Sequence, residues 1–127
     1  MSRDALIGAL AALGAGFFLV FGLWAFLDAR SFFDQIARFE PYNAHFLHDV
    51  GAFQVGIGST LAIALWRRTD ALFVALAGSG IGATFHVAAH IFDGALGGSV
   101  AATVGLALVA VLLLTGAAVR QAGGRSH

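Results

Sequence analysis

Four stretches of this chain are long and apolar enough to cross a lipid bilayer, and they fill most of its 127 residues. A helix needs roughly 20 predominantly apolar residues to cross the hydrocarbon core. Backbone groups cannot stay unpaired in lipid, so such stretches form helices. We therefore expect an all-α integral membrane four-helix bundle in which residues 1–127 form a single domain. The expected spans are residues 5–27, 43–66, 71–92 and 100–119.

The composition agrees with this fold class and limits which kinds of partner the chain can bind. Charged residues make up 11% of the chain, against about 25% in a soluble domain. Basic and acidic residues balance at seven each, so the chain lacks the basic surface that nucleic acid requires. Cysteine is absent, which excludes disulfides and metal sites built on thiolates. The expected direct partner is the lipid bilayer, and nucleic acid is excluded.

The arginines predict how the chain crosses the membrane, because cationic residues in short loops favour the cytoplasmic side. Two of them, Arg30 and Arg38, fall on one side of the predicted topology. The other five share the opposite side: Arg3, Arg67, Arg68, Arg120 and Arg125. The use of arginine without lysine, with many alanines and glycines, suggests a bacterial source. We therefore expect a bacterial inner-membrane protein with both termini in the cytoplasm and a first span that is retained.

The segment between the first two spans predicts a short amphipathic helix that lies in the membrane interface. Residues 31–34 resemble a capping box with aspartate in the last position. Apolar residues then recur at helical spacing, as interfacial helices require: Phe32, Phe33, Ile36 and Phe39. Pro41 should end this helix, since the residue before a proline is disfavoured in the α region. Asn43 is a suitable N-cap for the next span.

Four of the five histidines form two clusters inside or beside the apolar stretches. The first cluster contains His45, His48 and Asp49, and the second contains His86, His90 and Asp93. The spacings are i, i+3, i+4 and i, i+4, i+7, so each cluster occupies one face of its helix. Because ionisable groups are costly at membrane depth, they indicate a functional site by default.

The same two helices are expected to bring the clusters together. They are joined by a short connection, which predicts an antiparallel hairpin with both clusters at one depth near the outer surface. Small residues continue the two stripes and would allow close helix contact: Ala52, Gly56, Ser59, Thr60, Ser79, Gly82 and Ala83. We therefore expect an outward-facing His/Asp pocket between the second and third spans.

The sequence is compatible with three functions for this pocket. It does not decide whether the protein is an enzyme. The preferred interpretation is a small multi-pass membrane binding or accessory protein, acting as a homo-oligomer or within a larger membrane complex. Its polar groups would then hydrogen-bond one another, lipid headgroups or loop backbone. One alternative is a proton-coupled transporter subunit, because series of Asp and His side chains serve as proton relays.

The runner-up to the preferred interpretation is a metal- or haem-dependent membrane oxidoreductase that uses the same histidines. Imidazole binds transition metal ions such as Zn, Fe, Cu and Ni, and haem b is the weaker expectation. The expected ligands are His45, His48, His86 and His90. Asp49 and Asp93 would be further ligands or would orient the imidazole rings.

Two stretches carry a family resemblance. Residues 42–54 (YNAHFLHDVGAFQ) and 85–90 (FHVAAH) resemble small uncharacterised four-helix bacterial membrane proteins, which are broadly similar to the DoxX-like group. The resemblance implies a four-helix inner-membrane bundle. It implies no particular activity and no catalytic residues.

Overall fold

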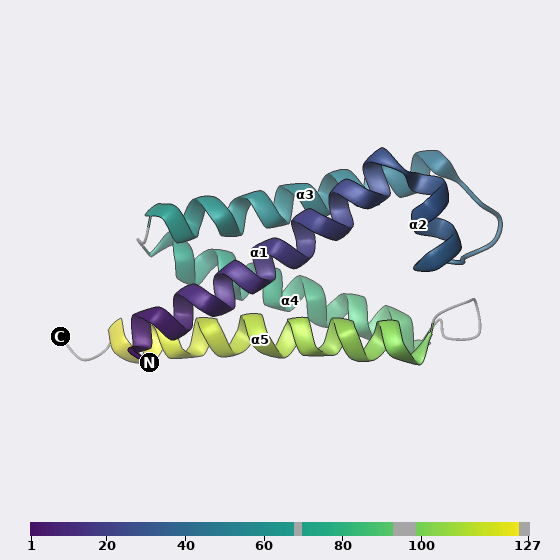
Figure 1. Cartoon of the computed structure of the whole chain (residues 1–127). Coiled ribbons are helices and arrows are strands. Elements are labelled where there is room, and N and C mark those ends of the chain that lie inside the picture. Colours follow the sequence, from purple (N-terminus) through teal and green to yellow (C-terminus); the bar gives the residue numbers. More distant parts are fainter. Residues whose placement is uncertain (68–69, 93–98, 125–127) are drawn as a thin grey trace.

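The computed structural model describes residues 1–67, 70–92 and 99–124, which contain five helices and no strand (Figure 1). Four helices are long and apolar enough to cross a membrane, so the all-helical class expected from the sequence is confirmed. The last helix runs beyond residue 119, where the apolar stretch was expected to end. The helices are α1 (Arg3–Leu27), α2 (Ala29–Gln35), α3 (Ala44–Arg67), α4 (Ala71–Phe92) and α5 (Val100–Gly124).

Polar side chains cap the starts of three of the long helices, α1, α3 and α5. The first N–H groups of a helix have no partner within it, and a side-chain oxygen just before the helix can accept from one of them. Ser2 Oγ accepts from the backbone nitrogen of Ala5 at 3.2 Å, and Ser99 Oγ from that of Ala102 at 3.1 Å. Asn43 Oδ1 accepts from the backbone nitrogen of Phe46 at 3.1 Å, which confirms Asn43 as the predicted cap.

The long helices associate as two pairs, α1 with α3 and α4 with α5. The α3 and α4 helices approach each other beside their connection and diverge toward α2 (Figure 1). The closest backbone approach lies between α1 and α3. A Cβ added at Gly22 would lie 2.8 Å from the backbone nitrogen of Val55, and one added at Gly51 would lie 2.7 Å from the carbonyl oxygen of Gly22. Glycine is required here because the two backbones meet without side chains between them.

The prediction that Gly56 and Gly82 lie at a close contact between α3 and α4 is wrong. A Cβ added at Gly56 or at Gly82 would meet nothing within 4 Å. Gly51 and Gly56 lie roughly 140° apart around α3, at 3.6 residues per turn. Both faces of α3 offer small residues, and the face with Gly51 is the one that meets α1.

The core lies at the end of the bundle where α3 and α4 are connected. Four side chains are almost fully buried there, one from each long helix: Ile7, Leu61, Leu76 and Leu113. A second apolar cluster lies at the opposite end, where α2 covers α1 and α3. The bundle is thus closed by apolar packing at one end and by α2 at the other.

A short helix, α2, lies between α1 and α3, but its limits differ from the prediction, and it ends well before Pro41, the residue expected to end it. Its cap is Asp28, whose Oδ1 accepts from the backbone nitrogen of Ser31 at 3.1 Å, and it ends at Gln35. The predicted cap Ser31 instead accepts a hydrogen bond from Trp24 Nε1 at 3.2 Å. Phe32 and Phe33 are only 4% and 5% exposed, since they pack inward on the protein.

Candidate functional site

The two histidine clusters are arranged differently from each other. On α3, His45 Nε2 lies 3.6 Å from Asp49 Oδ2, and both side chains are exposed. The ring of His48 lies against Phe26 of α1, with 5.6 Å between ring centroids. These contacts leave the first cluster on the outer surface of α3 and at its boundary with α1.

On α4, the imidazoles of His86 and His90 are adjacent. Their centroids are 5.0 Å apart, as the i, i+4 spacing predicts. His90 also meets the ring of Phe39 edge to face at 6.1 Å. The remaining member of the predicted cluster, Asp93, lies outside the described residues.

Within residues 1–67, 70–92 and 99–124, no three or more histidine, cysteine or acidic side chains are grouped so that they could hold a metal ion. A bundle metal site normally draws ligands from facing helices. The members of the predicted set, His45, His48, His86 and His90, instead make local contacts on their own helices. His45 lies beside Asp49 on α3, and His86 lies beside His90 on α4. The transition-metal and haem b hypotheses stay predictions.

A cavity of about 710 Å³ lies where the helices diverge. All five helices contribute to its wall, and α2 lies over one side. The volume is within the range of about 300–1,000 Å³ typical of small-molecule sites. Seven phenylalanines line it: Phe17, Phe18, Phe21, Phe32, Phe33, Phe39 and Phe46.

The polar groups on the wall are few, and none of them carries a permanent charge. In the described part of the chain, no Asp, Glu, Lys or Arg side chain lines the cavity. The polar lining residues belong to three helices and to the segments before α3 and α5: Gln35, Asn43, Gln54, His86, His90 and Ser99. A permanently charged ligand would find no opposite charge here, so the lining favours a neutral one.

Two of these side chains have polar atoms that the fold leaves unsatisfied. Gln54 Oε1 on α3 and His90 Nδ1 on α4 are buried without a hydrogen-bond partner among the described residues. A buried polar atom without a partner costs about 1–3 kcal/mol. Because both residues line the cavity, a rotation of either side chain can present the atom to a bound molecule.

Sequence reasoning singled out His86 and His90 as site residues but gave no site role to Gln54 or to the aromatic lining. Gln54 lies outside the i, i+3, i+4 stripe of the first cluster, on a different face of α3. The signal for an aromatic cavity was the abundance of phenylalanine, 12 in 127 residues. Composition alone cannot tell which of them face a cavity and which face lipid.

Comparisons of this chain with protein families, with curated proteins and with solved structures find no match. The function therefore has to be argued from the geometry of the chain itself.

Proposed function

We propose that this chain is a small multi-pass membrane protein that binds a neutral, largely apolar molecule in the cavity between the α1/α3 and α4/α5 pairs. The observation that supports this most strongly is the pair of unsatisfied polar atoms, Gln54 Oε1 and His90 Nδ1, on residues that line it. Native proteins pair nearly all buried polar groups, so an orphan at a cavity wall calls for a partner.

The lining restricts the chemistry of the ligand. The phenylalanine rings favour an apolar body with flat or ring-shaped parts, because aromatic rings pack well edge to face and offset. The Gln54 amide both donates and accepts hydrogen bonds, and neutral histidine does the same through its two nitrogens. A hydroxyl, carbonyl or amide group on the ligand matches both side chains.

The ligand reaches the cavity from the bilayer in this proposal. Apart from the region beside their connection, α3 and α4 make little contact, so they leave space between them. Large apolar side chains on their outer faces, such as Phe53 and Phe85, are 78% and 74% exposed, as suits contact with lipid tails.

The placement and assembly of the protein are further parts of this proposal, and they rest on the sequence patterns. The protein lies in the bacterial inner membrane with both termini in the cytoplasm, and α2 lies at the outer interface above the cavity. It acts as a homo-oligomer or within a larger membrane complex. The resemblance to DoxX-like four-helix proteins is in keeping with this placement.

The alternative is a metal- or haem-dependent oxidoreductase that uses the same cavity. The observation that favours it is the adjacent His86 and His90, two imidazoles that line the same wall. Two histidines supply only part of a ligand set, so other ligands would have to come from the bound molecule or a second chain. A proton-coupled transporter subunit gains less support, because His45 and Asp49 do not line the cavity.

The test is the identity and amount of apolar material that co-purifies with the full chain in mild detergent. Extraction and mass spectrometry should find a neutral molecule at close to one per protein. His90→Phe and Gln54→Leu should each weaken its binding roughly tenfold, the effect of a lost hydrogen bond of about 1.4 kcal/mol, and so lower its occupancy. His45→Phe is the matched control, since this histidine is exposed outside the cavity, and should leave occupancy unchanged. A ligand that all three variants retain equally is bound elsewhere.

A further inference from the structure

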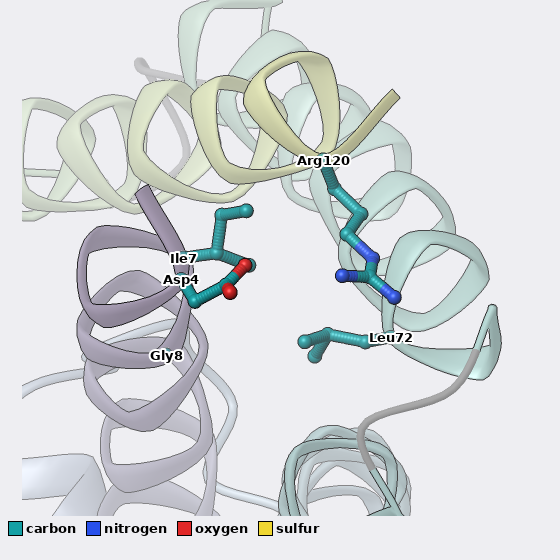
Figure 2. A pocket seen from close by; sticks show the side chains of 5 residues that line it. All are labelled: Asp4, Ile7, Gly8, Leu72 and Arg120. Atoms are coloured by element: carbon teal, nitrogen blue, oxygen red, sulfur yellow. The ribbon is translucent and has the colours of Figure 1, made fainter. Parts of the chain in front are cut away.

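A second, smaller hollow lies at the other end of the bundle, where α1 begins and α5 ends. Its volume is about 120 Å³, and it is formed by side chains from α1, α4 and α5. Asp4 and Arg120 extend into the space between the helices, and Leu72 of α4 bounds the third side (Figure 2). Ile7 and Gly8 complete the lining. We call this hollow the terminal notch.

The terminal notch holds two opposite charges that do not neutralise each other. In the described part of the chain the ion pairs within 4.0 Å are Arg30–Asp34 and His45–Asp49, and neither involves the notch. The side chains of Asp4 and Arg120 also make no hydrogen bond there. Among the described residues, the Asp4 carboxylate and the Arg120 guanidinium thus face one small space without an ion-pair or hydrogen-bond partner.

The neighbouring Arg3 has a different task. Its guanidinium donates to the backbone carbonyl oxygen of Arg120 at 3.3 Å, in the last turns of α5. Arg3 is absent from the lining of the notch. Among the described residues, the lining of the notch therefore has one cationic and one anionic side chain.

We propose that the terminal notch binds the headgroup of a zwitterionic phospholipid that carries a primary ammonium group. The phosphate would lie on Arg120, because guanidinium and phosphate form bidentate charge-assisted hydrogen bonds. The ammonium would lie on Asp4, whose carboxylate accepts its N–H groups. Ile7 and Leu72, which are 1% and 4% exposed, close the bottom of the notch beneath the two charged groups.

The charges also determine which headgroups fit less well. A headgroup with a net negative charge would leave the Asp4 carboxylate facing an anion without a cation between them. A quaternary ammonium would supply the positive charge but no N–H donor. The position of the notch suits a lipid rather than a soluble ligand. It lies where α1 begins and α5 ends, and both helices are long enough to cross a membrane. This inference is independent of the ligand in the large cavity.

The experiment measures lipid binding to the full chain by native mass spectrometry in detergent. The probes are phosphatidylethanolamine, phosphatidylcholine and phosphatidylglycerol with identical acyl chains, and soluble glycerophosphoethanolamine as a competitor. The ethanolamine lipid should bind roughly tenfold more tightly than the glycerol lipid, the effect of one charge-assisted hydrogen bond. The choline lipid should lie between them, and the soluble headgroup should not compete.

Two variants separate the roles of the notch residues. Asp4→Asn should abolish the preference for ethanolamine over glycerol, whereas Arg120→Gln should weaken binding of all three lipids. Arg38→Gln, at the other end of the bundle, is the control and should change nothing. Equal binding of the three lipids by the unmodified chain, or a preference that survives Asp4→Asn, would overturn the proposal. Effective competition by the soluble headgroup would assign the notch to a soluble ligand instead.

Discussion

Replacing Gly51 by alanine should push α1 and α3 apart. The added Cβ would lie 2.7 Å from the carbonyl oxygen of Gly22 and 2.8 Å from the backbone nitrogen of Phe26. Real Cβ atoms essentially never approach another heavy atom closer than 3.0 Å, so one helix has to move. The obstructing atoms belong to the backbone and cannot rotate away. Overpacking of this kind costs about 1–3 kcal/mol.

Gly56→Ala is the matched control on the same helix. Both variants gain the helix propensity of alanine over glycine, about 1 kcal/mol, but the Cβ at Gly56 would meet nothing within 4 Å. The free energies of unfolding should therefore differ by about 1–3 kcal/mol, with Gly51→Ala the less stable. The assay is reversible unfolding in mixed detergent micelles, followed by circular dichroism. Equal stabilities would refute the assigned α1–α3 contact.

Three further predictions concern stability, orientation and metal. Ser99→Ala should lower the free energy of unfolding by about 1 kcal/mol, because it removes the cap of α5; an unchanged unfolding curve would show that this cap is not formed. Cysteine introduced at Glu40 should react with an impermeant reagent from outside intact cells, and cysteine at Asp70 should not; the reverse pattern would invert the topology. Metal analysis and an absorption spectrum of purified protein should show only trace metal and no Soret band. Stoichiometric metal that is lost in His86→Ala would favour the oxidoreductase.

The helices were predictable because each depends on a local property of the chain. A long apolar stretch has to be helical in lipid, and Asn43 precedes α3 with a side chain that can cap it. The start of α2 was harder to predict. Both Asp28 and Ser31 are suitable caps, and the choice depends on Ser31 meeting Trp24 of α1 instead.

The pairing of the helices was not predictable from spacing along a single helix. The α3 and α4 helices are neighbours in the chain, yet α3 packs mainly on α1, where Gly22 provides the complementary surface. The local side-chain pairs, His45 with Asp49 and His86 with His90, follow from i, i+4 spacing. Whether two such pairs meet depends on how each helix is rotated, which its own sequence does not determine.

The large cavity depends on the divergence of α3 and α4, and so it could not be seen in the sequence. Its wall gathers residues from distant parts of the chain, from Phe17 to Leu106. The unsatisfied atoms of Gln54 and His90 become notable only once the packing around them is known.

The most direct test of the proposed binding function is to fill the cavity without disturbing the backbone. Gly105 lines the cavity and has open space beside its Cα, so Gly105→Leu should insert a side chain where the ligand lies. Gly16 also has open space but lies outside the cavity lining, which makes Gly16→Leu the matched control. Mass-spectrometric counting of extracted apolar molecules per protein should show loss of the ligand in Gly105→Leu alone. Full occupancy in Gly105→Leu would contradict binding in this cavity.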